Sequence, residues 1–288
     1  MDIVSELFFS NFRAEVDKAL KSKIKSTATN TELYQSCIYH LRLDDDIISP
    51  TLEYSKRIRP YFCMLIGSEN GYNMDMICAL ASSIELIHNA SLIVDDIQDN
   101  DTFRCGREAL WSLIGIPKAA SCAYFLEGIG QQLFHDTMRR YSLYDYTSYF
   151  YEQMIALVNG QHDDLCEAKQ GIESYLSMVD GKTGALLRLS FILGATPHDY
   201  DANKVLVIEN LANSFARIHQ LNDDIDGIKD NKKNDTSILE YIPSSDLITV
   251  KNYLTCELFN TLEEVYRQEI VRTKKFEQVI TTLVTRHK

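Results

Sequence analysis

Two long apolar segments that each lead into a cluster of aspartates constrain this chain more than any other feature. From Met74 to Asp99, apolar side chains recur at three- and four-residue steps, which predicts a helix buried on at least one face. The segment from Lys204 to Asp226 repeats this pattern. The sequence therefore predicts two long core helices that finish in carboxylates, namely Asp95, Asp96 and Asp99 in one, and Asp223, Asp224 and Asp226 in the other.

The rest of the chain also favours helices. Only 5 Pro and 12 Gly occur in 288 residues, too few for a sheet protein that turns every ten residues or so. Prolines stand between helix-length segments, because proline cannot continue a helix. These breaks are Ser49-Pro50, Gly115-Ile116-Pro117, Ala195-Thr196-Pro197 and Tyr241-Ile242-Pro243. We find no internal repeat or flexible linker, so we expect residues 1–288 to form a single all-α domain.

Charge and cysteine content narrow the partners and the compartment. The 41 acidic residues exceed the 29 basic ones, and the net charge of −12 disfavours nucleic acid or an anionic membrane as the main partner. The seven cysteines lack a Cys-x-x-Cys pair and no secretory leader precedes them, so we expect reduced thiols in the cytoplasm. Charge or histidine interrupts each apolar run before the roughly 20 residues of a membrane span, and none is expected.

The first aspartate cluster has the spacing of a metal site. On a helix, Asp95 and Asp99 share a face, with Cβ atoms within about 6 Å of each other. A hard divalent cation relieves the repulsion between such carboxylates, and Mg²⁺ leaves its other positions to water and phosphate. The alternative is that each cluster is a solvated helix end, as most charge runs are. The apolar helices that lead directly into both clusters favour a functional site.

Around the first cluster, residues 85–100 read E-L-I-H-N-A-S-L-I-V-D-D-I-Q-D-N. This stretch resembles the trans-isoprenyl diphosphate synthases, and most of all the eukaryote-type geranylgeranyl diphosphate synthases. Further motifs stand in the family's order: Lys56-Arg57-Ile58-Arg59-Pro60, Gly115-Ile116-Pro117, Gly160-Gln161 with Asp164-Leu165, Lys182-Thr183-Gly184, and Gln220 with Asp223-Asp224. Six ordered motifs are far more specific than one. The resemblance implies a helical bundle of the class I isoprenoid synthase type around a central active-site cavity.

The resemblance also implies a site that holds three Mg²⁺ ions on the diphosphate of an allylic substrate. The expected metal ligands are Asp95, Asp96, Asp99, Asp164, Asp223 and Asp224. The cations expected on the allylic diphosphate are Arg104, Lys182 and Lys233. Groups expected near the reacting carbon or the metals are Thr183, Gln161 and Gln220. The residues expected to bind the second substrate, isopentenyl diphosphate, are Lys56, Arg59 and His88.

Each of the smaller motifs has a structural alternative. The basic residues at 56, 57 and 59 are equally typical of an exposed charge run. His88 on an apolar helix is typical of a core histidine. The Lys182-Thr183-Gly184 segment is also consistent with an ordinary helix break.

The sequence departs from the family mainly on the acceptor side. Cys105 stands where a second arginine is expected to contact isopentenyl diphosphate, although Arg107, one helical turn beyond Arg104, is placed to compensate. Ser55 replaces a glycine, and His219 replaces a phenylalanine. Losing one charge-assisted contact of about 1.5–3 kcal/mol weakens binding by one or two orders of magnitude.

Three hypotheses remain open. The first is a prenyltransferase that condenses an allylic diphosphate with isopentenyl diphosphate to a geranylgeranyl-length product and acts as a homodimer. The second is a terpene synthase, or a prenyltransferase that uses a different acceptor. The third is a regulatory subunit that pairs with an active synthase, which the nearly complete aspartate motifs argue against.

Overall fold

A computed structural model of the chain describes residues 3–44, 57–166, 171–198, 200–229, 238–271 and 274–285. Its contacts group into two compact units. The N-terminal unit comprises Leu7–Met64 and Asn73–Leu143, and the C-terminal unit comprises Met1–Glu6, Leu65–Tyr72 and Tyr144–Lys288. The prediction of a single domain stays a prediction.

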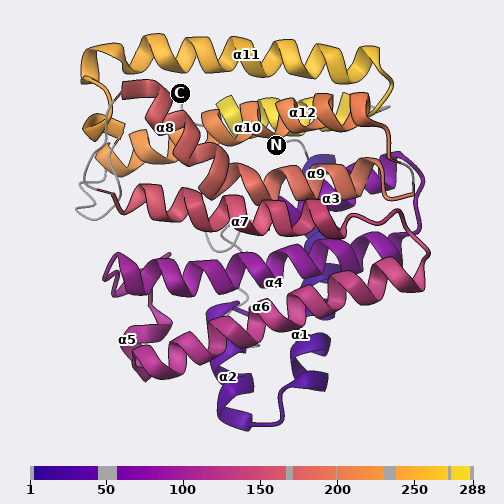
Figure 1. Cartoon of the computed structure of the whole chain (residues 1–288), viewed down its shortest axis with the longest axis vertical. Helices are drawn as coiled ribbons and strands as arrows, with labels where there is room; N and C mark the ends of the chain where they lie inside the picture. The colour runs from indigo at the N-terminus through magenta and orange to yellow at the C-terminus, as the bar shows by residue number, and fades with distance from the viewer. Residues whose placement is uncertain are drawn as a thin grey trace. The chain divides into compact units, whose positions relative to one another are not determined.

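Helices dominate the first half of the chain. The helices are α1 (Ile3–Thr27), α2 (Thr31–His40), α3 (Ile58–Glu69), α4 (Met74–Gln98), α5 (Leu110–Ile114) and α6 (Ile116–Arg140). In Figure 1, α4 and α6 lie side by side along most of their length. Gly130 on α6 permits this approach, because a Cβ there would lie 2.8 Å from Ile87 Cγ1 and 3.0 Å from the Ser83 carbonyl oxygen of α4.

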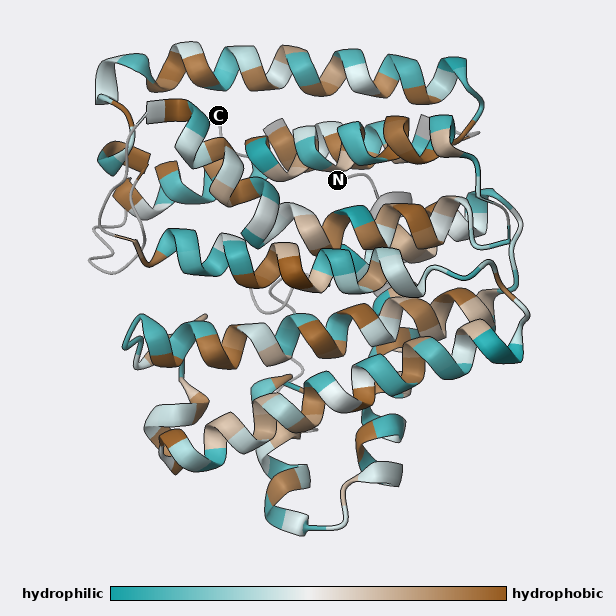
Figure 2. Cartoon of the chain, in the orientation of Figure 1, coloured by the Kyte–Doolittle hydropathy of each residue, from teal (hydrophilic) through white to brown (hydrophobic). Residues whose placement is uncertain are grey.

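Helix α4 carries the first aspartate cluster and is anchored at its start. The Asn73 side chain accepts a hydrogen bond from the Met76 amide at 3.0 Å, which caps the N-terminus. Brown, apolar residues recur along α4 in Figure 2. In the part of the chain that the structure describes, α4 alone is long and apolar enough to cross a membrane, but 67% of its most apolar window is buried inside the structure.

A two-residue hairpin follows α4. Strands β1 (Phe103–Arg104) and β2 (Arg107–Glu108) pair antiparallel, with Arg104 opposite Arg107. The turn residues Cys105 and Gly106 have positive φ angles of 51° and 75°, as a type I′ turn requires. We expected Arg107 to lie one helical turn beyond Arg104, but it lies opposite Arg104 across the hairpin. The reason is that Cys105 and Gly106 adopt a tight turn and do not continue a helix.

The second half of the chain is also helical. Its elements are α7 (Thr147–Asp164), α8 (Gly171–Val179), a π-helical turn (Asp180–Gly184), α9 (Ala185–Ala195), α10 (Ala202–Lys229), 3₁₀ turns at Ile238–Glu240 and Ser244–Asp246, α11 (Leu247–Arg267) and α12 (Lys274–Thr285). The rings of Phe191, Phe215 and Phe276 pack together in its core, with centroids 5.7–6.3 Å apart. Helix α11 lies beside α10 in Figure 1 and alternates apolar and polar residues in Figure 2.

The all-α prediction is confirmed, apart from the small hairpin. The expected breaks at Gly115, Ala195 and Pro243 coincide with helix ends, whereas Ser49-Pro50 lies outside the described residues. The segment predicted to end at Asp226 continues as helix α10 to Lys229. The second aspartate cluster therefore stands inside the last turns of a helix, although Gly227 follows it directly.

Candidate active site

The first aspartate cluster forms one ionic network with Arg104. Asp95 and Asp96 lie in the last turn of α4, and Asp99 is its C-cap residue. The Arg104 guanidinium donates from Nε to Asp96 Oδ1 at 2.6 Å and from Nη2 to Asp95 Oδ2 at 3.0 Å. The hairpin thus places one cation across two carboxylates, so repulsion between the aspartates is partly relieved.

Asp96 is the most buried member of this cluster, with 1% of its surface exposed. Burial raises its pKa to about 6, against the opposing effect of Arg104, and the neighbouring Asp95 adds to the rise. Its second oxygen, Oδ2, is buried and accepts no hydrogen bond from the described residues. A buried carboxylate oxygen without a donor fits a metal ligand, because a cation would stabilise its ionised form.

Among the described residues, no group of three or more His, Cys, Asp or Glu side chains is arranged so that it could hold a metal ion. Mg²⁺ commonly takes only one or two carboxylates from a protein and leaves its other positions to water and substrate phosphate. Asp95 and Asp96 fit that requirement.

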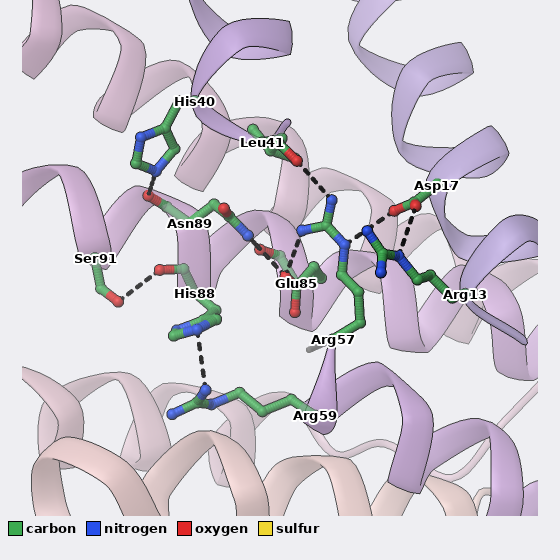
Figure 3. Close-up of polar contacts among 10 residues, drawn as sticks. All are labelled: Arg13, Asp17, His40, Leu41, Arg57, Arg59, Glu85, His88, Asn89 and Ser91. Atoms are coloured by element: carbon green, nitrogen blue, oxygen red, sulfur yellow. Dashed lines mark hydrogen bonds and ion pairs between the residues drawn. The ribbon is translucent and has the colours of Figure 1, made fainter. Parts of the chain in front are cut away.

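The predicted acceptor residues Arg59 and His88 lie together in the N-terminal unit (Figure 3). Arg59 Nη1 is 3.0 Å from His88 Nε2. Burial, reinforced by Arg59 and Arg104, holds the pKa of His88 well below its ordinary value, so the neutral ring accepts this hydrogen bond. The third predicted acceptor residue, Lys56, lies outside the described residues.

Arg57 lies at the centre of Figure 3 and is 4% exposed, which rules out the alternative of an exposed basic run at this position. It donates from Nη1 to Glu85 Oε1 at 2.7 Å and from Nε to Asp17 Oδ1 at 2.9 Å. Its Nη2 donates to the Leu41 carbonyl at 2.8 Å. Its φ angle is +44°, so the backbone is left-handed immediately before α3. These contacts hold the start of the helix that carries Arg59.

His40 stands at the edge of the same cluster. Its Nε2 lies 3.0 Å from the Asn89 carbonyl oxygen, to which it donates (Figure 3). Removal from bulk water, with Arg104, Arg57 and Arg42 nearby, lowers its pKa from 6.5 to about 3. In the native protein, the His40 imidazole therefore becomes protonated only at low pH.

The lowered pKa of His40 predicts that the native protein loses stability in acid. Between pH 6.5 and about 3 the unfolded chain protonates His40 and the native chain does not, so the free energy of unfolding falls as pH falls. The variant His40→Gln keeps a donor for the Asn89 carbonyl but cannot be protonated. We expect it to reduce the slope of the free energy of unfolding against pH by up to about 1.4 kcal/mol per pH unit, which corresponds to one proton. Urea unfolding between pH 4 and 7 measures the difference. Equal slopes in both proteins would contradict the assignment.

In the C-terminal unit, Asp224 is held by two donors. Tyr175 Oη donates to Asp224 Oδ2 at 2.7 Å, and Gln220 Nε2 donates to Oδ1 at 2.8 Å. Thr183 Oγ1 in turn donates to Gln220 Oε1 at 2.9 Å. Burial raises the pKa of Asp224 to about 7, against the effect of these donors. By contrast, 46% of the Asp223 side chain is exposed.

Lys182 and Asp164 meet beside this network. Lys182 Nζ donates to Asp164 Oδ2 at 2.6 Å. The π-helical turn that carries Lys182 packs directly on α7, where a Cβ at Gly160 would lie 2.1 Å from the Lys182 backbone nitrogen. Residue 160 must therefore be glycine. The 182–184 segment is not a helix break but a wide turn inside continuous helix, a feature that often marks functional sites.

The predicted residues thus fall into two groups. The N-terminal unit holds Arg59, His88, Asp95, Asp96, Asp99 and Arg104. The C-terminal unit holds Gln161, Asp164, Lys182, Thr183, Gln220, Asp223 and Asp224. Lys233 lies outside the described residues. That both groups line one central cavity stays a prediction.

Two buried groups were missed by the sequence analysis. Arg57 was read only as part of a basic run, and Tyr175 reads as one apolar position of a short amphipathic helix. The partners of Arg57 lie 28 and 40 residues away, and the carboxylate bound by Tyr175 lies 49 residues away. No local pattern reveals such pairs.

The fold is similar to that of solved isoprenoid synthases. A solved structure of an isoprenoid synthase family member from Thermotoga neapolitana superposes with a TM-score of 0.75 at 18% identity, and covers 94% of this chain and 98% of that chain. At this identity the likeness concerns the fold alone.

The polyprenyl synthetase family model matches residues 45–283, so the chain belongs to the polyprenyl synthetase family. Among curated relatives, a short chain isoprenyl diphosphate synthase of Methanocaldococcus jannaschii is 26% identical over 230 residues, which cover 79% of this chain and 66% of the relative. A geranylgeranyl pyrophosphate synthase of Dictyostelium discoideum is 30% identical over 188 residues, which cover 59% of each chain. The chain therefore matches about three fifths to two thirds of these relatives' lengths.

Proposed function

We propose that this protein is a Mg²⁺-dependent prenyltransferase that ionises an allylic prenyl diphosphate and joins it to isopentenyl diphosphate. The observation that carries the proposal is the pair formed by the half-buried Asp95 and the buried Asp96, both bound by Arg104, in a member of the polyprenyl synthetase family. The curated relatives named above, a short-chain and a geranylgeranyl synthase, support this class of reaction.

The reaction breaks the carbon–oxygen bond of the allylic diphosphate, and the electron pair leaves with the diphosphate. Mg²⁺, when bound, supplies charge that stabilises this leaving group, and three ions are expected. Asp95, Asp96 and Asp99 from α4, with Asp164, Asp223 and Asp224, are the residues that would hold it. Arg104 and Lys182 are the described cations for the diphosphate, and both already lie against carboxylates of these clusters.

The acceptor half of the reaction needs a second anion site. Arg59 and His88 form a hydrogen-bonded pair in which the imidazole is neutral, and the Arg59 guanidinium supplies the positive charge that a diphosphate requires. After the isopentenyl double bond attacks the allylic cation, one proton must leave, and the departing diphosphate is a suitable acceptor.

Arg107 does not replace the arginine that is missing at Cys105. Its guanidinium pairs with Asp44 and lies 4.0 Å from the centroid of the Tyr39 ring. We therefore expect weak binding of isopentenyl diphosphate compared with a synthase that carries both arginines.

The test is to incubate the pure protein and Mg²⁺ with farnesyl or geranylgeranyl diphosphate, with and without isopentenyl diphosphate. A longer prenyl alcohol after phosphatase treatment, formed only with isopentenyl diphosphate, is the expected product. Turnover that is unchanged when Mg²⁺ is removed by chelation would overturn the metal assignment.

The cysteine at position 105, where the family carries an arginine, favours a second candidate function. An enzyme without a strong acceptor site can pass the allylic cation to its own distal double bonds, as a terpene synthase does, or to a different acceptor. Hydrocarbons or cyclic alcohols formed without isopentenyl diphosphate in the same incubation would identify this activity.

We also propose that the protein acts as a cytoplasmic homodimer through α7. On this helix Tyr151, Ile155 and Val158 are 42%, 61% and 67% exposed. They are spaced by four and three residues and so share one face. A second copy of this chain would bury that apolar stripe.

The dimer makes a measurable prediction. We expect a mass of twice 33.0 kDa for the purified chain by light scattering. The double variant Ile155→Glu with Val158→Glu should shift the mass to that of one chain, because it places charges in the buried stripe. Ile248→Glu is the control, since Ile248 on α11 is 74% exposed and lies outside the stripe. A monomeric native protein would refute the proposal.

A further inference from the structure

Tyr175 is a fully buried side chain whose hydroxyl contacts a predicted metal ligand. Its exposed fraction is 0%, and its Oη donates to Asp224 Oδ2 at 2.7 Å. Tyr175 comes from α8 and Asp224 from α10. The contact therefore ties two helices of the C-terminal unit together at the second aspartate cluster.

The Tyr175 ring is itself held in place. It packs edge-on against Tyr241, with ring centroids 5.4 Å apart and an interplanar angle of 65°. The Gly171 amide at the start of α8 donates to the Tyr241 carbonyl oxygen at 3.1 Å. The hydroxyl thus has little freedom to leave the carboxylate.

On its other side, the Asp224 carboxylate is fixed from its own helix. Gln220 Nε2 donates to Oδ1 at 2.8 Å, and Thr183 fixes the Gln220 amide by a hydrogen bond to its oxygen at 2.9 Å. The two oxygens of an ionised carboxylate have about four lone-pair sites in total, two on each oxygen. Each Asp224 oxygen accepts one of these two hydrogen bonds and therefore keeps a lone pair for a cation.

We propose that Tyr175 is a positioning residue for the metal site: its hydroxyl fixes the orientation in which Asp224 meets a divalent cation. The inference rests on the proposed function, because it takes Asp224 to be a metal ligand. Donors to ligating carboxylates usually set the ligand's orientation, and their loss costs about 10- to 100-fold in metal affinity or activity.

The chain offers a matched control on the same acceptor helix. Tyr149 of α7 donates from Oη to Glu209 Oε1 of α10 at 2.8 Å. This pair has the same chemistry as the Tyr175–Asp224 hydrogen bond and differs from it by 0.1 Å in length, but Glu209 belongs to neither aspartate cluster. Tyr149→Phe therefore removes an equivalent contact without touching the proposed site.

The experiment is a titration of each folded protein with Mn²⁺, in which the free ion is followed by electron paramagnetic resonance. We expect Tyr175→Phe to weaken Mn²⁺ binding about 10- to 100-fold and Tyr149→Phe to leave it within about 2-fold. In the elongation assay, Tyr175→Phe should raise the Mg²⁺ concentration for half-maximal rate and leave the KM for isopentenyl diphosphate unchanged.

A double variant separates positioning from general loosening of the helices. If Tyr175 acts only through Asp224, the variant Tyr175→Phe with Asp224→Asn binds Mn²⁺ as weakly as Asp224→Asn alone. Additive losses, equal losses in Tyr175→Phe and Tyr149→Phe, or unchanged binding in Tyr175→Phe would each overturn the proposal. Absence of prenyl transfer by the native protein would instead refute the proposed function, and the Mn²⁺ titration does not depend on that activity.

Discussion

Asp96→Asn is expected to lower the rate of prenyl transfer by about a thousandfold or more, the cost typical of removing a group that stabilises charge in the transition state. Asp96 is nearly fully buried, and its Oδ2 accepts no hydrogen bond from the described residues. Asparagine keeps the shape of the side chain and removes its charge. Product formation at saturating Mg²⁺, measured with the radiolabelled isopentenyl substrate, gives the ratio of rates.

The control for this variant is Asp136→Asn on α6. Its carboxylate is 51% exposed and pairs with Arg139, three residues later on the same helix. This change should leave the rate within about twofold, because exposed ion pairs of this kind contribute little. If Asp96→Asn retained activity within tenfold of the native enzyme while binding Mn²⁺ equally well, Asp96 would not be a metal ligand.

Arg57→Met is expected to destabilise the fold by about 3–5 kcal/mol, because it leaves a buried carboxylate without its cation. The side chains of Arg57 and Glu85 are 2% and 3% exposed and lie 2.7 Å apart. Asn89 also donates to Glu85 Oε1 at 2.9 Å but brings no charge. Urea unfolding at pH 7 followed by circular dichroism measures the loss.

A second substitution tests the cause. Arg57→Met combined with Glu85→Met replaces the ion pair by apolar side chains and should recover most of the stability, since no buried charge is left unpaired. Lys118→Met is the control, because Lys118 and its partner Glu32 are 61% and 59% exposed, and the expected loss is below about 1 kcal/mol. If the double variant were as unstable as Arg57→Met, the loss of stability would come from lost packing and not from the unpaired charge of Glu85.

The fold class could be read from the sequence because helical periodicity is local. The three- and four-residue steps from Met74 onward predict α4, and the structure ends that helix at Gln98, next to the predicted limit. The proline at 197 marks a helix end for the same local reason. The expected spacing of one helical turn between Arg104 and Arg107 was wrong, since Cys105-Gly106 favours a tight turn.

The candidate site was only partly visible in the sequence. Motif residues such as Asp95 and Lys182 are identified by their resemblance to a family, which gives residue types and order. The resemblance does not give the partners that set their charge, such as the carboxylates on either side of Arg104.

By itself, the sequence determined the helical architecture, the family and the identity of the carboxylates and cations. The tertiary structure alone decided which groups are buried and what they bind: Arg57 with Glu85, His88 with Arg59, and Tyr175 with Asp224. The physical reason is that hydrophobic periodicity acts over one or two helical turns, whereas burial and hydrogen bonding depend on residues that folding brings together from distant parts of the chain.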